Sequence, residues 1–181
     1  MDLTIPCFDP ALIARSGQCF RMREGKGGIV TALAGADRVR VTPLGGDRFR
    51  FDCPPEDFER RWRAYFDLDT DYEAIQREDA GQDELLARAA CRGLRILRQD
   101  PWETLVCFLI SQRKSIPAIQ TCVEALCTRC GAKVGRGRGR YFAFPGPEDL
   151  LRAGERGLRA CGTGYRAPYL LDAARRVADG G

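Results

Sequence analysis

Among the side chains that could take part in catalysis or metal binding, this chain of 181 residues has nine cysteines and no histidine. Without histidine it can have no Ser-His-Asp triad, no histidine general base and no histidine zinc ligand. Residues 1–10 lack the basic start and apolar stretch of a secretory signal, and no apolar run reaches the length of a membrane span. We therefore expect a cytoplasmic protein without a disulfide framework and without membrane contact.

Four of the cysteines have a spacing that could hold a metal cluster. Cys122, Cys127 and Cys130 read C-x4-C-x2-C, with Cys161 further on, which is the ligand order of plant-type [2Fe–2S] centres. The same segment fits an amphipathic helix, because apolar residues recur at helical spacing over 116–126. Cysteines on the apolar face of a helix usually pack in a core. We expect no metal site and no cofactor, and an iron–sulfur electron carrier is the remote alternative.

Charge is unevenly distributed along the chain. Residues 1–54 hold 8 basic and 6 acidic side chains, residues 55–100 hold 8 and 12, and residues 101–181 hold 13 and 7. Lys and Arg attract the phosphates of nucleic acids independently of base sequence, so we expect a polyanion to bind the last part. The alternative is a solvated helical surface, and the basic run 133–140 also fits a solvated loop.

Hydrophobic periodicity divides the chain into two parts. The first part has period-two alternation, which predicts strands over 19–22, 29–33, 38–41 and 48–51. They indicate an antiparallel sheet with one face in solvent. At Pro55 the spacing becomes helical, and the aromatic residues from Phe58 to Phe66 are expected to pack a helix on the sheet. Short acidic helices are expected to follow through about residue 92.

The second part is expected to be helical from Pro101 onward. Asp100 is predicted as the N-cap of a helix over 102–111, which is apolar nearly all round and therefore expected to be buried. Further helices are predicted at 115–130, 148–161 and 167–178, with a loop at 131–146. The predicted fold class is α+β, with an N-terminal sheet domain at 1–95 and a helical domain at 96–181.

Three segments together resemble one protein family. They are Phe8-Asp9 with Ser16-Gly17-Gln18-Cys19-Phe20-Arg21, then Leu97–Glu103 with Ile110-Ser111-Gln112 and Ser115-Ile116-Pro117, then Phe144-Pro145 with Gly162-Thr163-Gly164-Tyr165-Arg166-Ala167-Pro168-Tyr169. In this order and spacing, the chain resembles the 8-oxoguanine DNA glycosylases and AP lyases of the helix-hairpin-helix superfamily over essentially its whole length. The resemblance implies a TBP-like N-terminal half, a helix-hairpin-helix glycosylase domain, and a monomer that binds double-stranded DNA with a damaged base.

The resemblance also implies roles for individual residues. Gly17 matches the glycine whose backbone carbonyl accepts the N7 hydrogen of 8-oxoguanine, and a glycine permits the close approach that this needs. Tyr165 and Arg166 match the pair that fills the gap left by the flipped base and bonds the unpaired cytosine. Two alternatives stay open: Gly17 fits a turn before a strand, and Tyr165 fits a core position at a helix start.

The chain departs from the family where the unpaired cytosine is contacted. After Gln112 the family commonly has an Asn-rich stretch, whereas this chain has Arg113, Lys114 and Ser115. Ala118 stands where an Arg often follows the Ile-Pro step. Arg113 is therefore a candidate donor to a base edge or a phosphate, and Lys114 a candidate phosphate contact. These replacements put the preference for cytosine opposite the lesion, and for 8-oxoguanine itself, in question.

The residues that cut DNA in the family have no match in this chain. The resemblance implies a Lys nucleophile in a Gly-rich hairpin and a downstream Asp, and both are expected beyond Gly181. Lys26, Lys114 and Lys133 stand in no such context. We therefore expect no catalytic residue and no cleavage activity in this polypeptide alone, and the alternative is a non-catalytic DNA-binding or interaction module.

Overall fold

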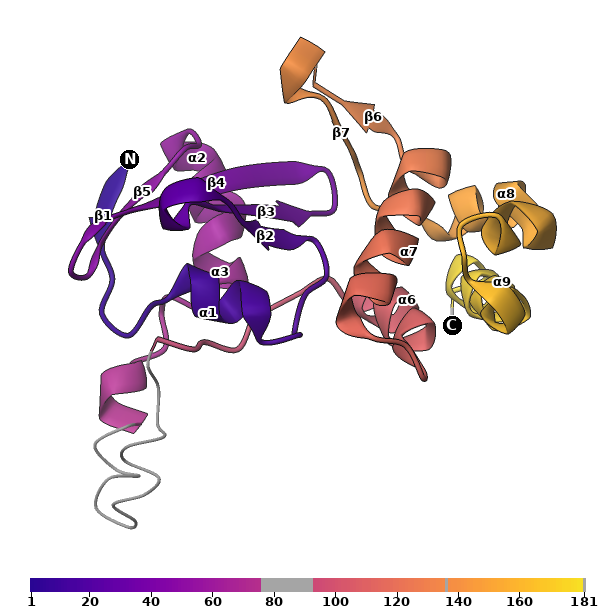
Figure 1. Cartoon of the computed structure of the whole chain (residues 1–181), viewed down its shortest axis with the longest axis horizontal. Coiled ribbons are helices and arrows are strands. Elements are labelled where there is room, and N and C mark those ends of the chain that lie inside the picture. The colour runs from indigo at the N-terminus through magenta and orange to yellow at the C-terminus, as the bar shows by residue number, and fades with distance from the viewer. Residues whose placement is uncertain (76–92, 136, 181) are drawn as a thin grey trace. The chain divides into compact units, whose positions relative to one another are not determined.

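The computed structural model describes residues 1–75, 93–135 and 137–180 (Figure 1). Contacts divide the chain into two compact units. Unit 1 consists of Met1–Ala32 and Arg38–Arg98, and unit 2 consists of Leu33–Asp37 and Gln99–Gly181. Within the described ranges, no helix combines the length and apolar character that crossing a membrane would need.

Unit 1 is built on a five-stranded sheet with the strand order β1-β5-β4-β3-β2. Its strands are β1 (Asp2–Thr4), β2 (Met22–Glu24), β3 (Val30–Ala34), β4 (Asp37–Gly45) and β5 (Arg48–Phe51). The pairs β1–β5, β4–β5 and β2–β3 are antiparallel. Its helical segments are α1 (Pro10–Arg15), η1 (Lys26–Gly28), α2 (Pro55–Asp57), η2 (Phe58–Trp62) and α3 (Arg63–Tyr65).

Aromatic rings form the core between the sheet and the segment α2–η2–α3. The Phe51 ring on β5 lies 5.1 Å from Phe58 and 5.9 Å from Phe66, measured between centroids. The Phe8 ring lies 5.0 Å from Phe49 and 5.3 Å from Phe66. All four pairs are edge-to-face, each worth about 0.5–1.5 kcal/mol beyond simple burial. The expected packing of the aromatic helix on the sheet is confirmed.

The strand expected over 19–22 is wrong in its first three residues, because β2 begins at Met22. The Arg21 N–H donates to Cys19 Sγ at 3.4 Å, so the chain makes a local turn here. The Tyr65 hydroxyl also donates to Cys19 Sγ, and this sulfur is buried. Alternation of residue types alone could not show that Cys19 points into the core through a turn.

Two short elements escaped the sequence analysis. The strand β1 has three residues and the helix α1 has six, which is too few for a periodic pattern to be recognised. Asp9 caps α1, since its carboxylate accepts the Leu12 N–H at 2.9 Å. The acidic helices predicted up to residue 92 fall mostly on 76–92, which lie outside the described residues.

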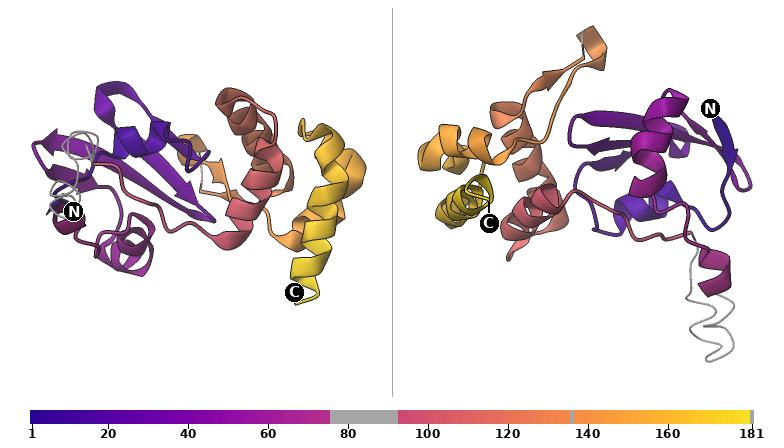
Figure 2. Two further views of the ribbon diagram at one scale, coloured as in Figure 1. Left: turned by 90° about the horizontal axis from the view of Figure 1, so that it is seen from below. Right: turned by 180° about the vertical axis from the view of Figure 1, so that it is seen from behind.

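Unit 2 is mainly helical, as predicted. Its elements are α6 (Pro101–Ser111), α7 (Ile116–Cys130), β6 (Lys133–Val134), η3 (Gly137–Gly139), β7 (Tyr141–Phe142), α8 (Pro147–Arg159), η4 (Gly164–Arg166) and α9 (Ala167–Ala178). The helices α8 and α9 lie side by side (Figures 1 and 2). At the start of α6, the Asp100 carboxylate accepts the Glu103 N–H at 2.9 Å, so the predicted N-cap is confirmed.

Two expectations about unit 2 are wrong. The helix α6 is not buried all round, because Phe108 is 62% and Leu105 38% exposed, whereas Val106 and Ile110 are buried. The predicted loop at 131–146 contains the hairpin β6–β7. Its strands have two residues each within a Gly-rich run, so no alternation marked them in the sequence.

Candidate nucleic-acid interface

Two loops of unit 2 carry the predicted DNA-contacting residues. The first loop, 112–115, joins α6 to α7, and the second, 162–166, leads into α9. Lys114 Nζ donates to the Gly162 carbonyl at 2.6 Å, and the Arg166 guanidinium donates to the carbonyl of Gln112. These two cation–carbonyl bonds bring the loops together, although they are far apart in sequence.

Arg113 is exposed at the end of α6 in a left-handed conformation, with φ of 55°. For a residue other than glycine this backbone costs about 1–2 kcal/mol. Strain of this kind is often stored where a side chain must be presented to a ligand. Within the described part of the chain, the Arg113 guanidinium makes no hydrogen bond or ion pair. Its five N–H donors are therefore available to a base edge or a phosphate.

Arg166 has a different environment, because only 6% of it is exposed. Besides its bond to Gln112, its Nη1 donates to the Thr163 carbonyl at 3.4 Å, and its guanidinium lies 4.4 Å from the centre of the Tyr165 ring. Among the described residues, Arg166 Nε has no hydrogen-bond partner. In this arrangement Arg166 holds the first loop in place and does not present its guanidinium to solvent.

Lys114 and Arg166 also set the electrostatics beneath the two loops. Cys122 lies buried on α7 within reach of both cations. Burial raises the pKa of the Cys122 thiol, and the positive charges of Lys114 and Arg166 oppose this rise. The thiol therefore stays protonated at physiological pH, so the buried Cys122 adds no charge beneath the two loops.

Exposed aromatic and apolar side chains accompany these cations. Tyr165 is 56% and Tyr169 61% exposed, and their separation of four residues places them near one another at the start of α9. Phe108 near the end of α6 and Ile116 at the start of α7 are also exposed. The sequence analysis singled out only Tyr165; the four-residue spacing to Tyr169 was the signal that could have added the second ring.

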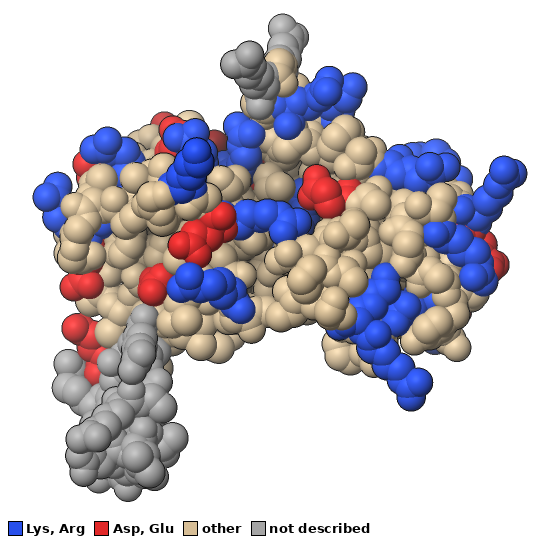
Figure 3. Space-filling model, in the orientation of Figure 1, with Lys and Arg blue, Asp and Glu red and all other residues tan. Residues whose placement is uncertain are grey.

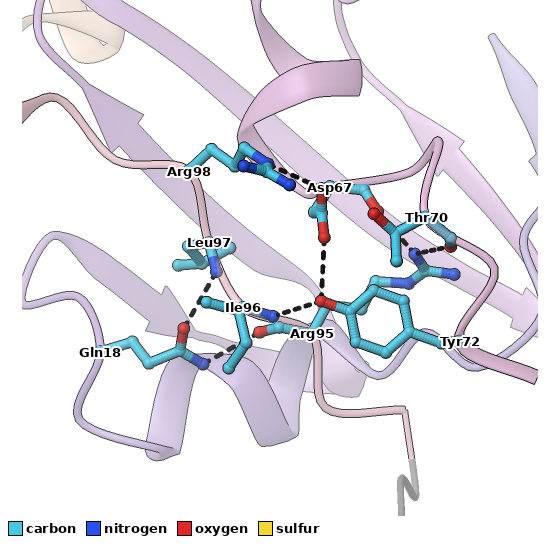
Figure 4. Close-up of polar contacts among 8 residues, drawn as sticks. All are labelled: Gln18, Asp67, Thr70, Tyr72, Arg95, Ile96, Leu97 and Arg98. Carbon is cyan, nitrogen blue, oxygen red and sulfur yellow. Dashed lines mark hydrogen bonds and ion pairs between the residues drawn. The ribbon is translucent and has the colours of Figure 1, made fainter. Parts of the chain in front are cut away.

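Gly17 lies in unit 1, in a turn after α1, with φ of 84°. The neighbouring Gln18 side chain ties this turn to the extended segment 94–98 (Figure 4). Gln18 Nε2 donates to the Arg95 carbonyl at 3.0 Å, and its Oε1 accepts the Leu97 N–H at 3.0 Å. Sequence reasoning missed Gln18, because nothing local indicates a partner 79 residues away.

The segment 94–98 is itself held by Arg95, which is only 3% exposed. Its guanidinium lies 4.5 Å from the centre of the Tyr72 ring and donates to four backbone carbonyls at 2.7–3.3 Å. These carbonyls belong to Pro6, Cys7, Asp67 and Thr70. One buried cation thus connects three stretches of unit 1 behind the Gly17 turn.

Asp67 completes this network, with its backbone in the left-handed region at φ of 51°. Its carboxylate accepts the Arg98 Nε–H at 2.8 Å and the Tyr72 hydroxyl at 3.0 Å. Burial opposes ionisation, but these hydrogen bonds outweigh it and hold the pKa of Asp67 below the usual 3.8. Burial raises the pKa of Tyr72, so its hydroxyl remains a donor.

A cavity of about 430 Å³ opens beside this network in unit 1. Its lining includes Ile5, Phe58, Tyr72 and Arg95, but none of the predicted site residues. The cavity therefore does not correspond to the site that the sequence predicted.

Within the described residues, no group of three or more Cys, Asp or Glu side chains is placed to hold a metal ion. Cys122 and Cys127 are buried on the apolar face of α7, where the helical interpretation placed them. Burial raises the pKa of the Cys161 thiol to about 11. The described cysteines thus offer no ligand set for an iron–sulfur cluster, and no observation favours that alternative.

Comparison with known proteins decides the family. Residues 2–105 match the family model of the 8-oxoguanine DNA glycosylase N-terminal domain, and residues 106–179 match that of the HhH-GPD superfamily of base excision DNA repair proteins. The chain belongs to the 8-oxoguanine DNA glycosylase family. It is 35% identical over 130 residues to the N-glycosylase/DNA lyase of Saccharomyces cerevisiae, an alignment that covers 70% of this chain and 35% of that protein.

Two solved structures are similar to nearly the whole chain. MBOgg1 in complex with a low-affinity DNA ligand has a TM-score of 0.90 and 38% identity, over 97% of this chain and 61% of that one. The Clostridium acetobutylicum 8-oxoguanine glycosylase/lyase, in complex with double-stranded DNA containing cytosine opposite 8-oxoG, has a TM-score of 0.88 and 34% identity. It is matched over 96% of this chain and 60% of its own length. The chain therefore spans less than two thirds of each of these relatives. The similarity over nearly all of this chain confirms its α+β fold class.

Proposed function

We propose that this chain is the damage-binding part of an 8-oxoguanine DNA N-glycosylase and AP lyase that acts in base excision repair. The observation that carries the proposal is the pair of loops 112–115 and 162–166, held together in a chain that matches the family from residue 2 to 179. These loops expose one unpaired Arg and one aromatic ring, Arg113 and Tyr165. The proposed partner is double-stranded DNA with an oxidised purine.

Each predicted residue has a task in this proposal. The damaged base must leave the duplex, because its glycosidic bond is inaccessible within the stack. The Gly17 carbonyl would receive the extra N7 hydrogen of 8-oxoguanine, and the exposed ring of Tyr165 would fill the vacated stack. Arg113 would bond the edge of the unpaired base or its phosphate, and Lys114 a neighbouring phosphate. Arg166, already bonded to Gln112, would hold the Arg113 loop in register.

Binding assays on 8-oxoguanine duplexes test this proposal directly. Fluorescence anisotropy would compare the 181-residue chain on matched duplexes with 8-oxoguanine or guanine at one position. We expect tighter binding to the damaged duplex. Equal affinity for both would contradict damage recognition and would favour the alternative of a DNA-binding module without selectivity. No binding to either duplex would contradict the proposal as a whole.

The base opposite the lesion provides a second test. Arg113, Lys114 and Ala118 replace residues that contact the unpaired cytosine in the family, and each base contact is worth about 1–3 kcal/mol of discrimination. We therefore expect the four duplexes with 8-oxoguanine opposite A, C, G or T to differ by less than about tenfold in affinity. A preference for cytosine well above that ratio would show that Arg113 and its neighbours read this base after all.

We propose further that the 181 residues bind without cutting. A lysine nucleophile must be neutral when it attacks the sugar. Lys114 Nζ donates to the Gly162 carbonyl at 2.6 Å, and Lys26 and Lys133 are exposed on short elements of units 1 and 2. Borohydride trapping on abasic-site DNA is expected to give no covalent adduct. An efficient adduct that is lost in one Lys→Ala variant would identify a nucleophile in this chain and contradict the prediction.

A further inference from the structure

The hairpin β6–β7 carries two cations, Lys133 in β6 and Arg140 directly before β7. Lys133 pairs with Phe142 and Val134 pairs with Tyr141. Arg140 directly precedes β7 and is two residues from Phe142, the partner of Lys133. The strands stay close at this point, because a Cβ added to Gly135 would lie 3.6 Å from the Arg140 Cα.

The hairpin is held through Tyr141 and at its base. The Tyr141 hydroxyl donates to the Ala36 carbonyl at 2.8 Å, and the Ala143 N–H donates to the Ala132 carbonyl at 2.8 Å. The base of the hairpin is tightly packed, since a Cβ added to Gly131 would lie 2.0 Å from the Ala143 carbonyl oxygen. The backbone of the hairpin is therefore held in place, and Lys133 and Arg140 extend from a fixed backbone.

The charges at this end of unit 2 are uncompensated. Arg129 at the end of α7, Lys133 and Arg140 are all exposed, and none of the three has an ion pair among the described residues. Other arginines of the same unit do have one: Arg152 pairs with Asp149, and Arg159 with Glu155. Figure 3 shows Lys and Arg side chains on the hairpin. We name Arg129, Lys133 and Arg140 the distal basic surface.

This surface and the two loops lie at opposite ends of one helix. The loop 112–115 precedes α7 and the hairpin follows it, so the 15 residues of α7 separate them. At 1.5 Å per residue this is about 22 Å, the length of about six base pairs of B-form DNA for a duplex that runs along α7, as the proposal below takes it to do. A duplex held at the loops must continue on both sides of the lesion.

We propose that the distal basic surface is a second DNA-binding site, which contacts backbone phosphates about six base pairs from the lesion. The inference rests on the proposed function, because it assumes that the loops engage the damaged site. Its contacts are with phosphates alone, so it adds affinity and register without reading base sequence or damage.

The test compares two double variants of the full 181-residue chain. K133A/R140A removes one Lys and one Arg from the distal basic surface, and K26A/R48A removes the same charges from exposed positions in unit 1. If each of the two residues contacts one phosphate, the negative slope of log Kobs against log salt should become shallower by about 2 in the first variant. Affinity should fall equally for damaged and undamaged duplexes, while the control keeps the wild-type slope.

Duplex length locates the contact. Shortening one of the two arms of the duplex below about six base pairs should abolish the difference in affinity between K133A/R140A and the wild type. Shortening the other arm should leave that difference unchanged. The charge-preserving variant K133R/R140K should restore the slope, which separates lost charge from a disturbed hairpin.

The outcomes separate the two proposals. If the wild type prefers damaged DNA but K133A/R140A behaves like K26A/R48A, the distal site is wrong and the proposed function stands. If K133A/R140A changes only the preference for damage, the phosphate assignment is wrong. If the wild type binds no duplex at all, both proposals are wrong.

Discussion

The Gly17 turn of unit 1 and the paired loops of unit 2 are held in place by different kinds of bond. The turn is tied to the segment 94–98 by a neutral amide, Gln18, which uses its donor and its acceptor on backbone groups. The loops are tied by two cations, Lys114 and Arg166, which each donate to a carbonyl of the other loop. The first tie carries no charge, whereas the second uses two cations, the half-buried Lys114 and the buried Arg166.

In the proposed function, this difference separates recognition of a damaged base from attraction of DNA. A neutral tie keeps the Gly17 carbonyl oriented at any ionic strength, because salt screens charges and leaves amide hydrogen bonds largely unaffected. Lys114 has three N–H donors and uses one on Gly162, so it can hold the loop and donate to a phosphate at the same time. Variants of the two regions should therefore differ in their salt dependence.

The largest effect is expected from R95A, which tests how much the Gly17 turn depends on the buried network behind it. Loss of the guanidinium leaves four carbonyls without their charged donor, so the free energy of unfolding should fall by about 3 kcal/mol or more. Urea denaturation followed by circular dichroism measures this. R98A is the matched control, because Arg98 is mostly exposed; equal losses in both variants would refute the assignment.

The next effect is expected from Q18A. Loss of two hydrogen bonds to backbone groups, worth about 1 kcal/mol or somewhat more in total, should reduce the preference for damaged over undamaged duplex about tenfold. The salt slope should stay that of the wild type, because no charge is removed. If Q18A changed the salt slope but not the preference for damaged duplex, the Gly17 turn would not differ from the two loops in the way described.

A smaller effect is expected from K114A, which should change the salt dependence of binding more than the preference for damaged DNA. It removes one cation and one of the two hydrogen bonds that join the loops. The negative slope of log Kobs against log salt should therefore become shallower by about 0.9, for the one phosphate contact that is lost. The preference for damage should change less than in Q18A. K114R, which keeps the charge, should retain most of the slope. Anisotropy titrations at several salt concentrations measure both quantities, and a slope equal to the wild type would show that Lys114 is only a structural tie.

The smallest effect concerns the pH dependence of unit 1. The pKa of Asp67 in the folded chain lies below its unfolded value of 3.8, so its contribution is present above that value and is lost as pH falls through the folded pKa. D67N should therefore be less stable than the wild type at neutral pH, and the difference should shrink below about pH 4. Thermal unfolding at several pH values tests this; a difference that grows on acidification would contradict the assigned direction.

Elements with a strong local signal could be predicted from the sequence. Helix α9 spans Ala167–Ala178, the range that its periodicity predicted, and α6 begins at the cap that Asp100 predicted. Capping and helical spacing depend on residues a few positions apart, so a single chain displays them. The hairpin β6–β7 and the strand β1 could not be found in this way, because two- and three-residue strands depend on a distant partner.

The candidate site shows the same division. The sequence named Gly17, Arg113, Lys114, Tyr165 and Arg166, but it could not distinguish an exposed Arg113 from a buried Arg166, since the carbonyl that binds Arg166 lies 54 positions away. It also passed over Gln18, whose amide looks like any surface Gln until its partners are known.

The sequence by itself determined the family, the α+β fold class, the helix boundaries with clear caps and the positive charge of the last part. Only the tertiary structure decided that Lys114 and Arg166 donate to carbonyls and that Arg113, among the described residues, stays exposed without a hydrogen bond. The physical reason is that burial and hydrogen-bond partners join residues far apart in the chain, 54 positions for Arg166 and Gln112 and 105 for Tyr141 and Ala36. Residue types and local spacing fix what a side chain can do, and packing fixes what is left for it to bind.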